Sequence, residues 1–271
     1  MRKIKMACRD ALKAKKANLE KTTILETKKE TPKSHYKLLF GVDSKTQAFD
    51  LLQNNIDLFD WVVRNKIHPD FWGRNINGQN SLTKEEINFI HNKGCKIAPI
   101  YVAYDETKTS EHGSIIAKKA LIAAMELGIP KNSAIFLEIF DDKAITSDCM
   151  LSYASAIAND GYIPAFKANT DAKYNFDREY SRCLREYSEL FKNSLVWATS
   201  PTLPDYEGMT TSHLIYPDIW KPFAPSGITR NDIAIWQYGK DCHPINNDSD
   251  VATSFNLNLV INDQIIIKKM F

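Results

Sequence analysis

Along the chain, short apolar runs alternate with longer stretches in which apolar residues recur at helical spacing. The apolar runs predict strands at 36–43, 71–76, 95–104, 133–140, 162–169, 195–200 and 232–239. The stretches between the first six runs predict helices. The first of these begins with Ser44 as its N-cap, the next follows a Thr83–Glu86 capping pattern, and another ends at Gly128 and Pro130. Strands that alternate with helices of this length indicate parallel βαβ units.

The loops and the last third of the chain indicate the class of α/β fold. No G-x-G-x-x-G turn follows the first predicted strand, and no phosphate-binding loop occurs, which disfavours a nucleotide-binding fold. The helical pattern disappears after residue 200, where the chain is rich in proline. We predict a TIM-like β/α barrel over 35–271, modified by helix-poor last strands, with a doubly wound open sheet as the alternative.

The charge is unevenly distributed, although the whole chain carries only +2. The first 34 residues contain eleven Lys and Arg but four acids, which predicts a basic arm or linker ahead of the barrel domain. An arm for nucleic acid or an anionic surface is the alternative, but it lacks interleaved aromatic residues, so we expect no nucleic-acid partner. We find no signal peptide and no apolar stretch long enough for a transmembrane segment, and the location of the protein stays open.

The cysteines and histidines give no indication of a metal or cofactor. The five cysteines are scattered without a C-x-x-C pair, and the six histidines show no H-x-x-x-H spacing. We therefore expect no metal site and no cofactor.

Polar and aromatic residues gather where the predicted strands end, which is where a β/α barrel has its active site. Glu138 interrupts an apolar strand, and alternation places it on one face with Phe136 and Phe140, which we expect to be the barrel interior. Burial there favours a neutral carboxyl, which suits a general acid, whereas a structural pairing with Lys167 or Arg74 is the alternative. The other candidates at strand ends are Asp43, Arg74, Tyr101, Asp142, Asn169, Trp197, Trp236 and Gln237. Structural alternatives exist for six of these residues, such as a core position for the aromatic residues, an ion pair for Arg74, a helix cap for Asp43 and a loop hydrogen bond for Gln237.

Several motifs in order resemble a known family. The stretches "FGVDSKTQ", "AIFLEIFDD", "GYIPAFKANT", "LVWATSP" and "IAIWQYG" resemble the glycoside-hydrolase-like domain, formerly of unknown function, that is related to the family twenty-five (Chalaropsis-type) lysozymes. The resemblance implies a modified β/α barrel, cleavage of β-1,4 amino-sugar bonds in peptidoglycan without a metal, and acids on strand one and in a D-x-E pattern on strand four. Asp43 matches the first acid and Glu138 matches one of the pair. The other member falls on Phe136 or Phe140.

The leading hypothesis is a lysozyme- or muramidase-like glycoside hydrolase that acts on peptidoglycan or a related polysaccharide at the cell wall. Glu138 would be the general acid, and Asp43 would stabilise positive charge at the sugar. Tyr101, Trp197 and Trp236 would form the sugar platform, and Arg74, Asp142, Asn169 and Gln237 would bind hydroxyls or hold the carboxylates. The alternative is a catalytically inactive carbohydrate- or cell-wall-binding module on the same barrel, which the missing second acid favours.

Overall fold

The computed structural model describes residues 37–52, 55–65, 68–104, 107–140, 144–208, 210–211, 217–244, 253–261 and 264–271. The predicted basic arm, 1–34, and Asp142 lie outside these ranges. The arm therefore stays a prediction.

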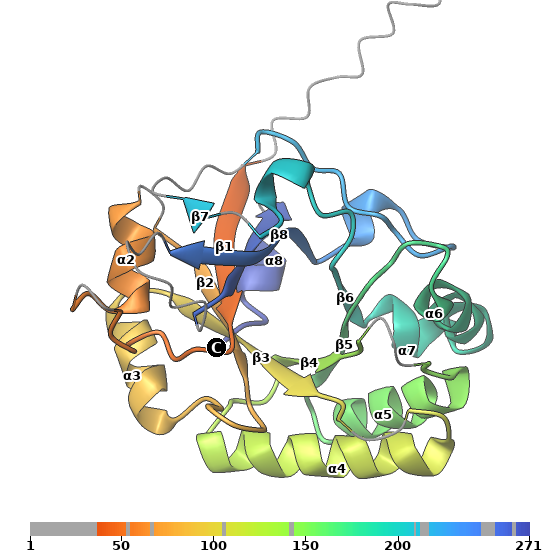
Figure 1. Cartoon of the computed structure of the whole chain (residues 1–271). Coiled ribbons are helices and arrows are strands. Elements are labelled where there is room, and N and C mark those ends of the chain that lie inside the picture. Colours follow the sequence, from red (N-terminus) through yellow and green to blue (C-terminus); the bar gives the residue numbers. More distant parts are fainter. Residues whose placement is uncertain are drawn as a thin grey trace, which may run out of the picture. The chain divides into compact units, whose positions relative to one another are not determined.

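Eight strands of the described chain close into a mixed barrel (Figure 1). Their bounds are β1 Leu38–Ser44, β2 Phe71–Asn75, β3 Lys96–Val102, β4 Ala134–Glu138, β5 Ile163–Ala168, β6 Leu195–Ala198, β8 Ile235–Pro244 and β9 Phe255–Ile261. Strands β1 to β6 run parallel in chain order, and β8 pairs in parallel with β6. Strand β9 closes the ring antiparallel to both β8 and β1, while the short β7, Thr210–Thr211, pairs with the far end of β8. The predicted modified barrel is confirmed.

Helices cover the outside of the barrel between the parallel strands. They are α2 Leu58–Arg64, α3 Lys84–Asn92, α4 Ser110–Leu127, α5 Ser147–Asn159, α6 Asn175–Glu186 and α7 Ser188–Lys192. The predicted caps hold, because Thr83 Oγ1 accepts the N–H of Glu86 at 3.1 Å and Gly128 ends α4 in the left-handed region at φ 74°. Between β6 and β8 the described segments contain no α-helix, but only the short β7 and two 3-10 turns, η1 Pro204–Tyr206 and η2 Arg230–Asp232, as the helix-poor pattern predicted. None of the helices in the described part of the chain is both long and apolar enough to cross a membrane.

The predicted start of the first helix is wrong. Ser44 is the last residue of β1, where it pairs with Arg74 on one side and Phe255 on the other, and this double pairing fixes an extended backbone. The helix begins only after Asp57, whose side chain accepts the N–H of Asp60 at 2.6 Å.

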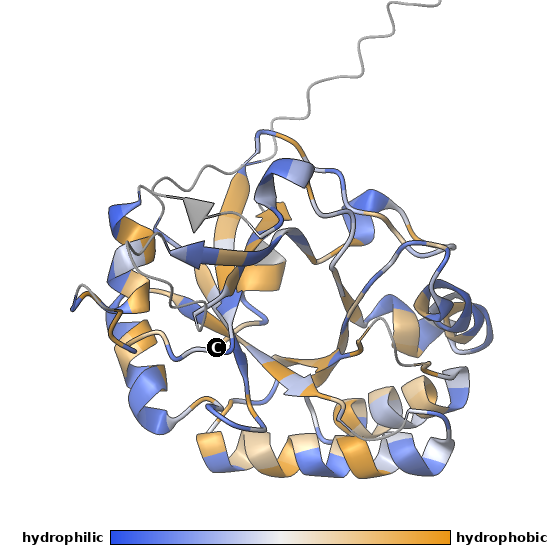
Figure 2. Ribbon diagram, viewed as in Figure 1, coloured by the Kyte–Doolittle hydropathy of each residue, from blue (hydrophilic) through white to orange (hydrophobic). Residues whose placement is uncertain are grey.

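Alternation of side chains along the strands gives two apolar clusters, and Figure 2 shows hydrophobic colouring on strands and on helices alike. Phe136, Trp197 and Ile235 lie in the cluster that fills the barrel, whereas Ile135 and Leu137 pack in the outer cluster between strands and helices. The predicted interior direction of the Phe136 face of β4 is therefore confirmed. Helix α8, Gln264–Ile267, and the segment after it pack against the amino ends of β3 and β4. The described polar residues predicted for the site lie at the opposite, carboxyl end of the barrel.

Candidate functional site at the carboxyl ends of the strands

Three charged side chains from β1, β4 and β5 meet at the mouth of the barrel. Lys167 Nζ lies 2.6 Å from Asp43 Oδ2 and 3.1 Å from Glu138 Oε1. The parallel strand pairing explains this, since β4 and β5 place Glu138 directly beside Lys167. We call Asp43, Glu138 and Lys167 the Lys167 cluster. It unites both predicted catalytic acids around one ammonium group.

Asp43 is the most firmly held member of the Lys167 cluster. Besides Lys167, its carboxylate accepts hydrogen bonds from Asn256 Nδ2 at 2.9 Å and from Asn258 Nδ2 at 2.7 Å, and the residue is 4% exposed. Asn258 is itself positioned by Trp197, whose Nε1 donates to Asn258 Oδ1 at 2.9 Å. With three donors and almost no exposed surface, Asp43 serves to organise the site.

Lys167 carries the positive charge of the cluster from an almost fully buried position. Its ammonium lies 4.8 Å from the centre of the Trp197 ring. Burial opposes the charge, but the neighbouring Asp43 and Glu138 carboxylates outweigh it and raise the pKa of Lys167 above its usual value. The lysine is therefore an ammonium at neutral pH, and it offsets the charge of the two acids.

Glu138 is the member of the Lys167 cluster that reaches the surface, with a side chain 17% exposed. Phe136 lies in the interior below it, and Phe140 packs partly buried against the same interior cluster. The apolar surroundings predicted from alternation are present, but Lys167 adds a cation to them. The structural pairing with Lys167, weighed as an alternative from the sequence, is the contact that forms.

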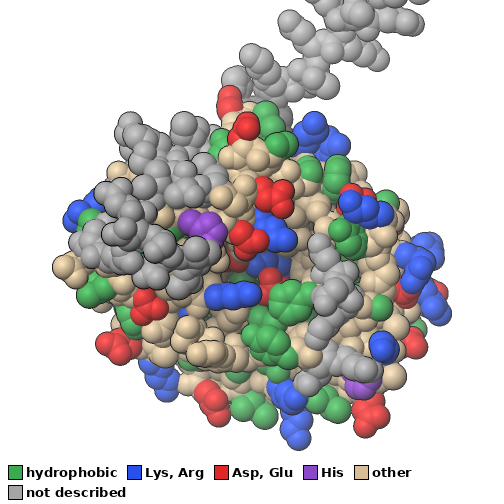
Figure 3. Space-filling model, in the orientation of Figure 1, with side chains coloured by type: hydrophobic (Ala, Val, Ile, Leu, Met, Phe, Trp, Pro, Cys, Tyr) green, Lys and Arg blue, Asp and Glu red, His purple; other side chains and the backbone are tan. Residues whose placement is uncertain are grey.

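A cleft of about 680 Å³ opens beside Glu138 and Lys167. Half-buried aromatic rings of Phe140, Tyr174 and Phe223 line it, together with Asn169 and Gln237. Figure 3 shows acidic and basic side chains next to one another around a hollow in the face turned to the viewer. A cleft of this size with aromatic and polar walls suits a small polar ligand or a short stretch of polymer.

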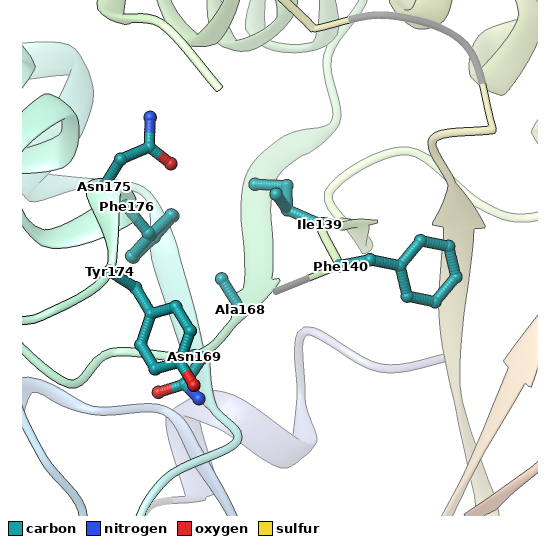
Figure 4. Close-up of a pocket in the computed structure, with 7 residues that line it drawn as sticks. All are labelled: Ile139, Phe140, Ala168, Asn169, Tyr174, Asn175 and Phe176. Atoms are coloured by element: carbon teal, nitrogen blue, oxygen red, sulfur yellow. The ribbon is translucent and has the colours of Figure 1, made fainter. Parts of the chain in front are cut away.

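A small pocket of about 10 Å³ adjoins the cleft between the ends of β4 and β5 and the start of α6. Figure 4 shows the Tyr174 ring beside the Asn169 side chain at this pocket. Asn169 Oδ1 accepts hydrogen bonds from Ser200 Oγ at 2.5 Å and from the N–H of Asp171 at 3.1 Å. The pocket has room for about one water molecule, and Asn169 lies at the mouth as predicted.

Arg74, which the sequence analysis expects to bind substrate, lies in the protein interior. Arg74 is fully buried, and its Nε lies 2.7 Å from Glu86 Oε1. Its other nitrogens donate to the carbonyls of Ser44 at 2.5 Å and Asn80 at 2.6 Å. Because these partners occupy the guanidinium and no surface is exposed, Arg74 holds β1, β2 and α3 together.

The three aromatic residues predicted as a sugar platform are also buried. Trp197 is fully buried inside the barrel against Phe136, and Trp236 is fully buried in the outer cluster, where its Nε1 donates to the Pro201 carbonyl at 3.0 Å. Tyr101 is 6% exposed in the same outer cluster. In this structure the three rings leave almost no surface exposed to a sugar.

Several residues at the site had no assigned role in the sequence analysis. Asn256 and Asn258 hold Asp43, and Tyr174 and Phe223 provide the aromatic surface that was expected from the buried residues. In the sequence, the alternation in "FNLN" indicates that Asn256 and Asn258 share one face of a strand. Their contact with Asp43 depends on the pairing of β9 with β1, which the sequence does not show. Among the described residues, no group of three or more His, Cys, Asp or Glu side chains is arranged to hold a metal ion.

The sequence and the fold were compared with known proteins. The model of the family described as "Rv2525c-like, glycoside hydrolase-like domain" matches residues 68–224, which confirms the predicted resemblance. A solved structure of an uncharacterized B. stearothermophilus protein is similar with a TM-score of 0.69 and 26% identity, over 86% of this chain and 100% of that chain. No curated protein sequence matches.

Two further solved structures are similar at lower scores. The catalytic domain of endolysin ply40 from bacteriophage P40 of Listeria monocytogenes has a TM-score of 0.47 and 15% identity, over 87% of this chain and 98% of that one. A family GH25 lysozyme from Aspergillus fumigatus has a TM-score of 0.43 and 11% identity, over 86% and 98% of the two chains.

Proposed function

Because the chain belongs to the Rv2525c-like family of glycoside hydrolase-like domains, we propose that its cleft binds a chain of amino sugars of the peptidoglycan class. The half-buried rings of Tyr174 and Phe223 provide apolar surface for sugar faces. Glu138 and Asn169 provide hydrogen-bonding groups for hydroxyls along the same cleft.

The position of Lys167 is the observation that favours glycan binding over glycan cleavage as the function. Glycoside hydrolysis by a carboxyl pair needs one acid to donate a proton and a second carboxylate that is free to attack the sugar or activate water. Here the ammonium of Lys167 lies between the two acids, at 2.6 Å from Asp43 and 3.1 Å from Glu138. Asp43 is 4% exposed and accepts three hydrogen bonds, so its carboxylate is not free for either task.

A second function, cleavage of a β-1,4 amino-sugar bond, is favoured by the spacing of the same acids. Since Asp43 Oδ2 and Glu138 Oε1 both contact Lys167 Nζ, these two oxygens lie at most about 6 Å apart, which is shorter than the separation of about 6.5–9.5 Å in inverting glycosidases and compatible with that of retaining ones. In this candidate mechanism Glu138 donates a proton to the leaving oxygen as the glycosidic C–O bond breaks. A water oxygen then bonds to the sugar carbon, and its proton returns to Glu138. Asp43 stabilises the positive charge that develops at the sugar.

Pelleting with insoluble peptidoglycan, together with an assay for new reducing ends, separates the two functions. We expect the wild type to pellet and to release no reducing ends, and Glu138→Gln to bind several-fold more weakly because the variant loses the carboxylate that accepts hydrogen bonds from sugar hydroxyls in the cleft. Glu126→Gln makes the same change on an exposed position of α4 and should bind as the wild type does.

The other outcomes are equally clear. Reducing ends released by the wild type but not by Glu138→Gln would establish cleavage in place of simple binding. A wild type that stays in the supernatant would remove the proposal.

A further inference from the structure

Gln237 occupies an unusual position on β8. Its neighbours Trp236 and Tyr238 lie in the outer cluster, while Ile235 lies in the interior, so alternation directs Gln237 to the barrel axis. It pairs with Asn258 of β9, which holds Asp43, and it lines the cleft. The residue is 4% exposed, and its Oε1 is buried without a hydrogen-bond partner among the described residues.

A buried carbonyl oxygen without a donor costs about 1–3 kcal/mol, and native proteins keep few of them. Donors in the neighbouring cluster are already engaged. Lys167 donates to Asp43 and contacts Glu138, and the Asn258 amide donates to Asp43. A ligand that brings its own donor into the cleft would satisfy Gln237 Oε1.

The charges of the cleft indicate what kind of donor fits. Its described lining contains four carboxylates, from Glu138, Asp171, Glu207 and Asp241. It also contains four ammonium groups, from Lys45, Lys167, Lys173 and Lys240. The balance gives no net attraction for a charged ligand, which favours a neutral donor.

Neutral sugar donors are hydroxyl groups and the acetamido N–H. The acetamido group also carries a methyl group that needs apolar surface, and the half-buried Phe223 ring lines the same cleft. We infer that Gln237 Oε1 accepts the acetamido N–H of an N-acetyl amino sugar, and that Gln237 thereby makes the cleft prefer acetylated glycans. The inference rests on the proposed function and specifies it, because it assigns one residue to one substituent of the sugar.

Calorimetric titration with three β-1,4-linked trimers tests this inference: N-acetylglucosamine trimer, glucosamine trimer and cellotriose. They share the linkage and differ at the carbon that bears acetamido, ammonium or hydroxyl. We expect the wild type to bind the acetylated trimer about tenfold more tightly than the other two, the value of one good hydrogen bond. In Gln237→Leu this preference should fall to about onefold through loss of affinity for the acetylated trimer alone.

The outcomes distinguish the inference from the proposed function. A wild type that binds all three trimers equally, or a Gln237→Leu variant that weakens all three by the same factor, overturns the role of Gln237 and leaves glycan binding intact. A wild type that binds neither the trimers nor peptidoglycan overturns both.

A thermal melt would show whether Gln237→Leu folds. A second variant tests the inference if it does not. Gln237→Glu keeps an acceptor at the same position and adds a negative charge. It should therefore shift the preference about tenfold from the acetylated trimer towards the glucosamine trimer, whose ammonium groups it attracts. An unchanged order of affinities in this variant would contradict the inference.

Discussion

Two buried charge clusters stand at the same end of this barrel, and they differ in one respect. The Arg74–Glu86 pair is sealed, with neither side chain exposed. The Lys167 cluster opens on the cleft through Glu138, whose side chain is 17% exposed. A buried ion pair therefore has a structural role at Arg74–Glu86, whereas the Lys167 cluster forms a candidate binding site. The difference between them is the exposed side of Glu138.

The choice of cation explains why one cluster can be sealed. The planar guanidinium of Arg74 has enough donors for Glu86 Oε1 and for two backbone carbonyls, so protein groups complete the guanidinium, while Glu86 Oε2 is buried without a hydrogen-bond partner among the described residues. Lys167 has a compact ammonium that contacts the carboxylates of Asp43 and Glu138 and lies over the ring of Trp197. One of those carboxylates, Glu138, has a side exposed to the cleft.

The largest expected effect comes from breaking the sealed pair. Arg74→Met should lower the free energy of unfolding by about 3–5 kcal/mol, because Glu86 and two backbone carbonyls lose their partner inside the protein. Urea denaturation at pH 7 measures the loss. Arg178→Met, at a side chain 75% exposed on α6, is the matched control and should change little. A loss below about 1 kcal/mol in Arg74→Met would show that the pair does not hold the strands together.

Breaking the open cluster should cost less stability. Lys167→Met should lower the free energy of unfolding by about 2–3 kcal/mol, since Asp43 keeps its two amide donors and Glu138 still reaches water. Lys118→Met on the exposed side of α4 is the control. A larger loss in Lys167→Met than in Arg74→Met would reverse the comparison.

The stabilisation that Lys167 gives to the fold should depend on pH, and the sign of this dependence follows from its pKa. The pKa of Lys167 is raised in the folded state, so its stabilisation is fully present below the unfolded value of about 10.4 and is lost as pH rises towards the folded value. From about pH 10 upwards the wild type should therefore lose stability relative to Lys167→Met as pH rises. A difference between the two proteins that is constant over this range would contradict the ammonium assignment.

The smallest effect concerns the acid of the sealed pair. Desolvation raises the pKa of Glu86 in the fold, although Arg74 opposes the shift. The protonated form thus stabilises the fold below the unfolded pKa of about 4.3, and this contribution is lost as pH rises through the folded value. Relative to Glu86→Gln, which does not titrate, the wild type should lose stability in urea denaturation as pH rises above about 4. The exposed neighbour Glu85→Gln should show no such trend, and a trend of the opposite sign for Glu86→Gln would refute the effect of desolvation.

Much of the fold could be predicted because its signals are local. The apolar runs, the Thr83 cap and the Gly128 stop are each encoded within a few residues, and alternation along β4 correctly directed the Phe136 face inward. Ser44 was misassigned because its backbone is fixed by strands that are distant in sequence.

The site was predicted only in part, because it depends on contacts that are distant in sequence. Asp43 and Glu138 do converge, but the asparagines that hold Asp43 lie 213 and 215 residues further along the chain. Composition could not show which aromatic rings are exposed either. Trp197 stands at a strand end yet faces the filled interior, whereas Tyr174 precedes α6 and lines the cleft.

Strand β9 links the site to the order in which the chain is made. It follows the other strands of the barrel along the sequence, and it supplies Asn256 and Asn258 to Asp43. A chain still growing on the ribosome presents open edges on β1 and β8 until β9 pairs with both, and such edges invite pairing with other chains. The two asparagine donors that hold Asp43 are therefore in place only after β9 has been made, and a barrel translated only as far as β8 has neither a closed sheet nor a finished cleft.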